Sequence, residues 1–266
     1  MTAIALTIAG SDSGGGAGVQ ADLKTFSALG VYGASVVTAI TAQNTRSVTA
    51  VEDISPATIA AQMRAVFSDL AVNALKVGMV SRSETIATIA GELAAFVGPV
   101  VVDPVMVATS GDRLLREDAI ETLRTRLIPL AAVVTPNLPE AALLTGKPVA
   151  ENADEMQVQA RAILSLGAKA VLIKGGHGSS AESTDFLITA DQTVVLTAER
   201  IETTNDHGTG CTLAAALAAE LAKGASLEDA AQSAKSYLHA ALKAGVALNV
   251  GSGRGPVHHF HGWWPA

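Results

Sequence analysis

Residues 206–213 (DHGTGCTL) carry the densest set of chemically useful groups in the chain. They follow a β-rich run and lead directly into the alanine- and leucine-rich run 213–221, so the glycines are predicted to lie at a helix N-terminus. The free N–H groups and partial positive charge of a helix N-terminus bind anions, and glycine lets an anion come close. The candidate phosphate or oxyanion site consists of Gly208, Thr209, Gly210 and Cys211.

Cys211 is the only cysteine in the sequence. A thiol at a helix N-terminus is expected to have a lowered pKa and to point at the bound anion. The alternative is a packing turn in which Cys211 is a small buried apolar residue. A single cysteine also excludes a disulfide within the chain and favours a reducing compartment.

Other polar side chains follow runs that are predicted to be strands. The carboxyl ends of parallel strands meet at one edge of an open α/β sheet, and ligands bind there. Asn137 and Glu140 also fit a capping box of the next helix, and Asp103 is a possible cap of its turn. The side chains expected along this edge are Gln43, Asp103, Asn137, Glu140 and Lys174.

Strands and helices alternate along the whole chain. Helices are predicted over 19–29, 55–70, 83–96, 153–167, 212–223 and 227–248. Strands are predicted over 3–9, 33–42 (continuous and buried), 74–79, 99–106, 131–135 and 168–173, with an antiparallel pair over 183–190 and 193–204. Since no Pro/Ser-rich linker or internal repeat interrupts the pattern, we expect one α/β domain, residues 1–266, in which helices flank a doubly wound, mainly parallel central sheet.

The composition excludes several classes of protein. Nearly half of the 266 residues (49%) are hydrophobic and 3% are aromatic, which suits buried parallel strands covered by alanine-rich helices. Apolar runs stay well short of the roughly 20 residues of a membrane span, and the first residues lack the pattern of a signal peptide. With 18 basic residues, 25 acidic residues and no Lys/Arg cluster, nucleic acid is not an expected partner. We expect a cytoplasmic protein without a membrane partner.

The glycine-rich segment 10–18 follows the first predicted strand, which is where nucleotide-binding motifs occur. It lacks the Lys-Ser/Thr pair of a Walker A loop. Residues 16–21 fit the dinucleotide pattern G-x-G-x-x-A, but no acidic residue follows about 20 positions later to hold a ribose. Glycine N–H donors, a lysine and an acid suited to Mg²⁺ instead indicate phosphoryl transfer from a nucleotide to a small alcohol.

Seven segments, in order, resemble the hydroxymethylpyrimidine/phosphomethylpyrimidine kinases of thiamine biosynthesis, which are ribokinase-like. The resemblance covers nearly the whole chain and implies a ribokinase-like fold. It also implies that ATP and Mg²⁺ are used to phosphorylate a small aminopyrimidine alcohol and then its monophosphate, and we expect a homodimer. The segments are 9–25 (AGSDSGGGAGVQADLKT), 38–45 (TAITAQNT), 76–79 (KVGM), 101–106 (VVDPVM), 135–141 (TPNLPEA), 173–177 (IKGGH) and 207–213 (HGTGCTL).

The resemblance implies a role for each matching residue. Asp22, which by itself reads as a solvated charge on a helix, becomes a ligand of the aminopyrimidine. The turn 208–211 becomes the catalytic anion hole, with Cys211 where most ribokinase-like sugar kinases carry an aspartate base. The implied ring site is Gly10, Asp22, Gln43, Met79 and Val105; the Mg²⁺ site is Asp103 and Glu140; the ATP-phosphate site is Asn137, Lys174 and Thr209, and Lys174 also acts in catalysis.

Two other functions fit parts of the pattern. A pyridoxine/pyridoxal kinase acts on a similar hydroxymethyl heterocycle, and Gln43 separates the two because an amide suits an aminopyrimidine edge. A pyrimidine sensor without turnover would need a broken phosphate site, which is not seen. Asp206 stands where the family suggests a neutral residue, and its role is open. For the His- and Trp-rich tail, residues 253–266, surface packing is favoured over a metal site.

Overall fold

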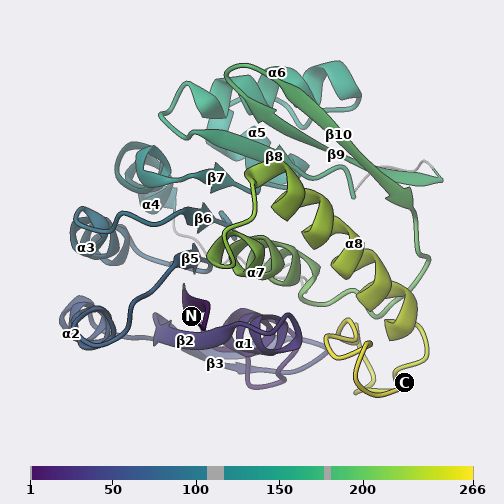
Figure 1. Cartoon of the computed structure of the whole chain (residues 1–266), viewed down its shortest axis with the longest axis horizontal. Helices are drawn as coiled ribbons and strands as arrows, with labels where there is room; N and C mark the ends of the chain where they lie inside the picture. Colours follow the sequence, from purple (N-terminus) through teal and green to yellow (C-terminus); the bar gives the residue numbers. More distant parts are fainter. Residues whose placement is uncertain (1, 107–116, 177–180, 266) are drawn as a thin grey trace.

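The computed structural model describes residues 2–106, 117–176 and 181–265. Its centre is an eight-stranded sheet with the order β10-β9-β8-β7-β6-β5-β1-β2 (Figure 1). The strands from β8 to β2 are parallel, whereas β9 is antiparallel to β8 and to β10. The strands are β1 (Ile4–Ala9), β2 (Tyr32–Val37), β5 (Ala74–Val77), β6 (Val100–Val102), β7 (Val133–Val134), β8 (Ala170–Ile173), β9 (Glu182–Thr189) and β10 (Thr193–Glu199).

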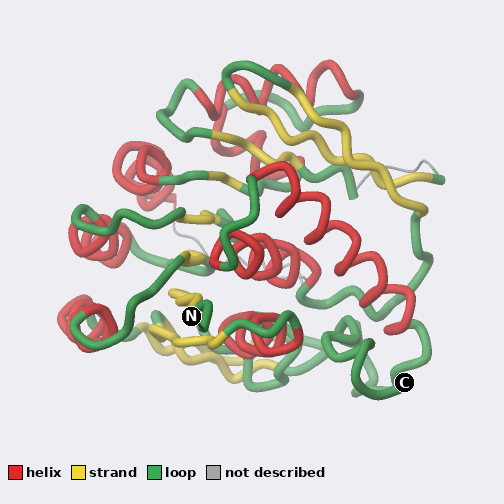
Figure 2. Tube along the Cα trace, viewed as in Figure 1, coloured by secondary structure: helices red, strands yellow, loops and turns green. Residues whose placement is uncertain are grey.

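Helices cover both faces of this sheet, as Figure 2 shows, and each face has its own buried core. One face packs against α2 (Pro56–Phe67), α3 (Ser83–Leu93), α4 (Glu117–Thr122), α5 (Leu138–Thr145) and α6 (Ala153–Leu164). A π-helical turn, Leu123–Leu127, and a 3-10 turn, Ile128–Leu130, follow α4. The other face packs against α1 (Gly18–Ala28), α7 (Thr209–Ala222) and α8 (Leu227–Gly245).

The sheet confirms the predicted doubly wound, mainly parallel α/β fold. Strands β1, β5, β6, β7 and β8 are almost entirely buried because helices cover both of their faces, which explains their short and nearly uniform runs of Ala, Val, Leu and Ile. The antiparallel pair β9–β10 is confirmed as well. Within the described ranges, no helix combines the length and the apolar character that crossing a bilayer requires.

The predicted buried strand over 33–42 is wrong, because the chain turns at Thr38. Strand β3 (Ala39–Gln43) leaves the central sheet and pairs with β4 (Val48–Asp53) in a separate antiparallel hairpin. The Thr38 N–H donates to Ala9 O (2.9 Å), and its hydroxyl donates to Met79 O (2.8 Å). These bonds join segments that are distant in sequence, so no local signal marked the break.

Candidate active site

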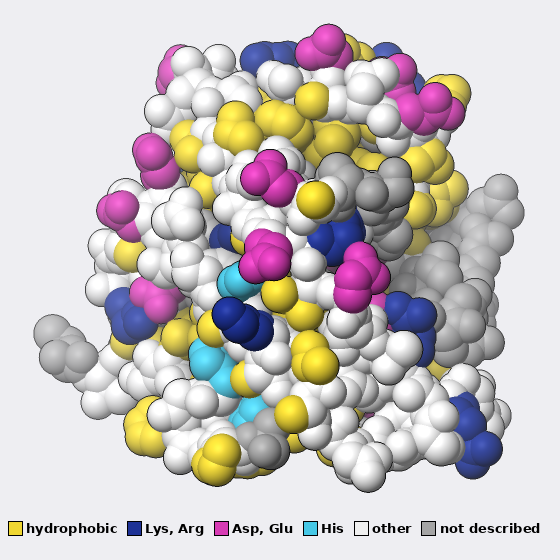
Figure 3. Space-filling model, turned by 90° about the vertical axis from the view of Figure 1, so that its right-hand side faces the viewer, with side chains coloured by type: hydrophobic (Ala, Val, Ile, Leu, Met, Phe, Trp, Pro, Cys, Tyr) yellow, Lys and Arg dark blue, Asp and Glu magenta, His cyan; other side chains and the backbone are white. Residues whose placement is uncertain are grey.

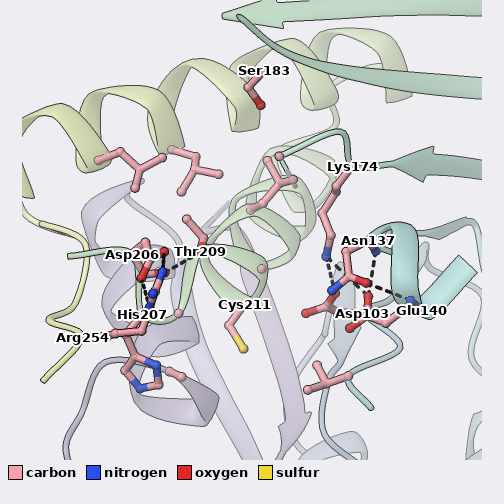
Figure 4. A pocket seen from close by; sticks show the side chains of 18 of the residues that line it. Asp103, Asn137, Glu140, Lys174, Ser183, Asp206, His207, Thr209, Cys211 and Arg254 are labelled. Carbon is pink, nitrogen blue, oxygen red and sulfur yellow. Dashed lines mark hydrogen bonds and ion pairs between the residues drawn. The ribbon is translucent and has the colours of Figure 1, made fainter. Parts of the chain in front are cut away.

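A cavity of about 1030 Å³ lies at the carboxyl ends of the parallel strands, over the N-terminus of α7 (Figure 4). It brings together almost all of the predicted site residues. Asp22 is not among the residues that line it, and His177, the last residue of the IKGGH motif, lies outside the described residues. The predicted residues that line the cavity are Gly10, Gln43, Met79, Asp103, Val105, Asn137, Glu140, Lys174, Gly208, Thr209, Gly210 and Cys211.

One side of the cavity holds a lysine between two carboxylates. Lys174 Nζ lies 3.1 Å from Asp103 Oδ1 and 4.0 Å from Glu140 Oε2. Although burial alone would lower it, these carboxylates raise the pKa of Lys174, so the lysine is charged. Burial raises the pKa of Glu140 to about 7, against the opposing effect of Lys174. Asp103 Oδ2 is buried and has no hydrogen-bond partner within the described residues, so it can accept a bond from a ligand.

The capping box at the start of α5 is confirmed. The Asn137 N–H donates to Glu140 Oε2 (2.8 Å), and the Glu140 N–H donates to Asn137 Oδ1 (2.9 Å). The cap fixes the Glu140 carboxylate beside Lys174. The structural and functional interpretations of these two residues are therefore compatible, because the same hydrogen bonds that begin the helix also orient the site.

The N-terminus of α7 forms the middle of the site. The helix begins at Thr209, three residues earlier than predicted, because Gly208 adopts a left-handed φ of 82° and ends the preceding turn. A Cβ at position 208 would collide with the carbonyl oxygen of Gly16, so only glycine fits. Within the described residues, the N–H groups of Gly210 and Cys211 have no backbone acceptor. They are available to an anion in the cavity.

The expected lowered pKa of Cys211 is wrong. Burial raises the pKa of the Cys211 thiol to about 11; the Lys76 ammonium opposes this effect, and the Asp22 and Asp103 carboxylates add to it. The partial positive charge of the helix N-terminus does not lower the pKa enough to offset burial and the two nearby carboxylates. Cys211 is therefore a neutral thiol at neutral pH.

Asp22 lies beneath the cavity and is neither solvated nor part of its wall. Its two carboxylate oxygens lie 3.0 Å and 2.9 Å from Lys76 Nζ, and one accepts a 2.6 Å bond from the Thr7 hydroxyl. The side chains of Asp22 and Lys76 are fully buried. A Cβ at Gly78 would come 2.6 Å from Lys76 Nζ, so glycine makes room for the ammonium group. The one sequence signal for this pair was a lysine inside an apolar strand.

The glycine-rich loop after β1 is organised by Asp12, which sequence reasoning did not select. Its carboxylate accepts hydrogen bonds from the backbone N–H groups of Gly14, Gly16 and Ala17, at 2.8–3.0 Å. One of its oxygens, Oδ2, also lies 2.8 Å from Nε2 of His207, the residue immediately before the turn 208–211. Burial alone would raise the pKa of Asp12, but these hydrogen bonds hold it below its ordinary value. Asp12 therefore joins the first loop of the chain to the anion site.

A second ion pair that the sequence did not predict, after Asp22 with Lys76, lies at another part of the cavity wall. Lys235 Nζ, from α8, lies 2.7 Å from Asp185 Oδ2 and 3.2 Å from the Ser183 hydroxyl. Asp185 Oδ1 accepts a 2.9 Å bond from the Gly175 N–H, so the pair holds the backbone that follows Lys174. Because these residues come from separate elements, the sequence carried no signal for their contact.

The structure assigns Asp206 a partner, Arg254 in the tail. Arg254 Nε donates to Asp206 Oδ1 (2.8 Å), and a second guanidinium nitrogen bonds Asp206 Oδ2, which makes the pair bidentate. The Arg254 N–H also donates to Thr45 O (2.8 Å). The charge of the extra carboxylate is therefore balanced by Arg254 at the cavity rim, and the Arg254 backbone ties the tail to the β3–β4 hairpin.

The expectation that the tail packs on the surface is wrong for its first two histidines, which are buried inside the protein. His258 and His259 are buried, and His259 Nε2 lies 3.1 Å from the hydroxyl of Thr212 in α7. The Tyr237 hydroxyl, from α8, donates to His259 O (2.6 Å). Figure 3 shows histidine side chains on the side of the molecule that α8 and the tail occupy.

Replacing His259 by glutamine should reduce the acid sensitivity of folding. Burial lowers the pKa of His259 to about 3, with nearby Lys24 adding to the effect. The unfolded chain takes up this proton near pH 6.5, so the wild type loses stability as the pH falls below 6.5, by about 2–3 kcal/mol at pH 4.5. Urea unfolding at pH 7.5 and 4.5 measures this loss. Equal losses in wild type and His259→Gln would contradict the prediction.

Known proteins share this fold. A Bacillus subtilis pyridoxal kinase, solved as an ADP complex, has a TM-score of 0.90 and 39% identity; the match covers 97% of this chain and 98% of that one. The phosphomethylpyrimidine kinase from Clostridium difficile 630 has a TM-score of 0.78 and 47% identity, covering 88% and 97%. The fold and site therefore define a ribokinase-like small-molecule kinase.

The sequence comparisons identify the family. The phosphomethylpyrimidine kinase family profile matches residues 12–258. The hydroxymethylpyrimidine/phosphomethylpyrimidine kinase of Rhizobium meliloti (strain 1021) is 67% identical over 264 residues, 99% of each chain. This chain belongs to the phosphomethylpyrimidine kinase family.

Proposed function

We propose that the protein uses ATP to phosphorylate 4-amino-5-hydroxymethyl-2-methylpyrimidine and then its monophosphate, in thiamine biosynthesis. The observation that carries the proposal is the position of the α7 N-terminus. In Figure 4, Cys211 lies between the Lys174–Asp103–Glu140 cluster and His207, which contacts Gln43. An anion at this helix N-terminus would therefore lie between a charged phosphate site and a neutral ring site.

The ring site would be formed by an amide and apolar groups. Gln43 offers one donor and one acceptor side by side, which matches a ring nitrogen and its adjacent amino group. Met79 and Val105 line the same cavity. A Cβ at Gly10 would come 2.9 Å from Met79 Sδ, so glycine keeps the space between them open. Neither Asp22 nor Lys76 lines the cavity and both Asp22 oxygens are already bonded, so the pair would support the ring site from beneath without contacting the ring.

The nucleotide phosphates would lie along α7, against Thr209, Asn137 and Lys174. A relative of the same fold was solved with ADP, which supports a nucleotide site. The cavity also extends to Leu238 and Leu242 of α8, which offer apolar surface to a base. ATP is therefore the expected phosphoryl donor.

The residues present fit a Mg²⁺ site. Mg²⁺ is usually held by one or two carboxylates together with phosphate oxygens and water, and Asp103 and Glu140 face the cavity beside Lys174. The buried, unpartnered Oδ2 of Asp103 is a free oxygen ligand. When bound, Mg²⁺ would neutralise phosphate charge during transfer.

In the proposed reaction, the acceptor oxygen attacks the γ-phosphorus while the bond to the ADP oxygen breaks, and the proton of an alcohol acceptor is released to water late in the step. The loose transition state needs little early deprotonation, so a neutral Cys211 serves as a hydrogen-bond partner that positions the acceptor. The N–H groups of Gly210 and Cys211 stabilise the charge on the equatorial oxygens. Lys174 holds the γ-phosphate in line with the acceptor.

An assay of ADP release with three acceptors tests the proposal: the aminopyrimidine alcohol, its monophosphate and pyridoxal. The proposal requires the first two to be phosphorylated with higher kcat/KM than pyridoxal. The second candidate, a pyridoxal kinase, is favoured by the TM-score of 0.90 to a Bacillus subtilis pyridoxal kinase. A preference for pyridoxal would overturn the assignment.

Gln43→Met should weaken the pyrimidine reaction much more than pyridoxal phosphorylation. A ring edge left without its partner costs about 1–3 kcal/mol, or roughly 5- to 150-fold in kcat/KM. Both acceptors are compared in both proteins. If the two activities fell by the same factor, Gln43 would act on structure alone.

We also propose a cytoplasmic homodimer. The support for the dimer is the β3–β4 hairpin, which leaves the central sheet as a separate two-stranded element and carries one exposed apolar side chain on each face, Ile40 (54% exposed) and Val51 (44% exposed).

A further inference from the structure

The side-chain amide of Gln43 faces two protein groups as well as the cavity. Its Nε2 lies 3.3 Å from His207 Nε2, and its Oε1 lies 3.4 Å from Thr41 Oγ1. Each pair is a hydrogen bond only if one atom carries a proton that the other accepts. The other bonds of His207 and Thr41 decide whether that condition is met.

On the histidine side, the proton is already committed. His207 Nε2 lies 2.8 Å from Asp12 Oδ2, and the Asp12 carboxylate also accepts three backbone N–H bonds. An ionised carboxylate only accepts, so His207 Nε2 carries the proton and donates it to Asp12. That nitrogen therefore has no lone pair with which to accept a bond from Gln43 Nε2. As it stands, the 3.3 Å contact brings two donors together.

On the threonine side, the single hydroxyl proton is also committed. Thr41 Oγ1 lies 2.8 Å from the carbonyl oxygen of Ser11, which can only accept. Thr41 therefore has no proton left for Gln43 Oε1, but its oxygen can still accept a bond. Turning the Gln43 amide by 180° removes the contact between two donors: Oε1 then faces His207 Nε2–H and accepts the longer, weaker branch of a bond that this proton shares with Asp12, and Nε2 donates to the free lone pair of Thr41 Oγ1.

We propose that His207, backed by Asp12, and Thr41 are positioning residues that hold the Gln43 amide with its oxygen beside His207 and its nitrogen beside Thr41, and that this fixed order selects the acceptor. The backbone of Gln43 is held as well. Its N–H donates to Ser13 Oγ (2.7 Å), and the Ser13 hydroxyl donates to Gln43 O (2.8 Å). Both backbone groups of the residue are thus tied to the loop that Asp12 organises.

An amide that cannot rotate recognises a ring edge with one order of donor and acceptor and rejects the edge with the reverse order. After the two protein bonds are made, Gln43 keeps one free N–H and one free lone pair in a fixed order. An aminopyrimidine offers the complement, a ring nitrogen that accepts beside an amino group that donates. The 4-oxo analogue of the same alcohol reverses the order, with a ring N–H beside a carbonyl. A freely rotating glutamine would bind either edge equally well.

This inference rests on the proposed function, because it takes the aminopyrimidine alcohol as the acceptor. The experiment measures kcat/KM for that alcohol and for its 4-oxo analogue in the wild type, His207→Phe, Thr41→Val and Thr49→Val. Thr49→Val is the matched control: its hydroxyl also donates to a backbone carbonyl of the β3–β4 hairpin, Ala42 O (3.0 Å), but it is exposed, and this bond does not involve the Gln43 amide.

We expect the wild type to prefer the amino alcohol, and this preference to fall at least about tenfold in His207→Phe and in Thr41→Val, mainly through KM. Thr49→Val should keep the wild-type ratio. A purely structural role would lower both activities together, so an unchanged ratio in both variants overturns the inference while leaving the function intact. If the wild type failed to phosphorylate the amino alcohol, the proposed function and this inference would fall together.

Discussion

Replacing Lys174 by methionine is expected to lower kcat/KM for the aminopyrimidine alcohol at least about 100-fold, the largest single effect in the site. Methionine keeps much of the side-chain volume but removes the charge. It also leaves the buried carboxylates of Asp103 and Glu140 without the ammonium group that lies 3.1 Å and 4.0 Å away. Without this counter-ion the Asp103 carboxylate repels the phosphates that Lys174 would hold, while the pKa of Glu140, already raised by burial to about 7 against the opposing effect of Lys174, rises further and the group takes up a proton.

The matched control is Lys223→Met, near the other end of α7. Lys223 pairs with Glu220 at 2.7 Å in a partly exposed position outside the cavity, so its removal should change kcat/KM less than about twofold. Because the Lys174 variant also loses a buried ion pair, thermal unfolding of both variants separates misfolding from lost catalysis. A folded Lys174→Met enzyme with kcat/KM within about twofold of wild type would remove this lysine from the proposed mechanism.

Cys211→Asp should largely retain the first phosphorylation and almost abolish the second. In the second step the acceptor is itself a phosphate, lying at the α7 N-terminus against residue 211. Two unit charges about 4 Å apart repel by about 4 kcal/mol at an effective dielectric constant of 20, which corresponds to a loss of roughly 1000-fold. The wild-type thiol avoids this repulsion, because burial keeps its pKa near 11 and the group neutral.

Cys211→Ser is the control for this prediction, because serine is neutral and keeps a hydrogen-bond donor at the same position. We expect it to lower the two steps by similar factors. The ratio of kcat/KM for the alcohol to that for the monophosphate is measured in all three proteins. If Cys211→Asp lowered both steps equally, tolerance of the second acceptor's charge would not explain the cysteine.

The sequence by itself determined the fold class and most of the cavity wall. Uniform apolar runs predicted parallel strands buried on both faces, and the geometry of a parallel sheet then placed Asp103, Asn137 and Lys174 at one edge without any knowledge of tertiary contacts. The capping box of Asn137 and Glu140 was predictable because it lies within four consecutive residues. Local patterns decide local structure.

The tertiary structure alone decided the charges and partners inside the site. Asp22 pairs with Lys76, Asp12 with His207 and Asp206 with Arg254, over separations of 54, 195 and 48 residues. Such pairings have no local signature. The pKa of Cys211 shows the same limit: its helix position predicted a lowered value, but burial beside carboxylates from distant segments reversed the sign. Electrostatics depends on which groups fold close together and on how much water they lose, and only the folded chain sets either.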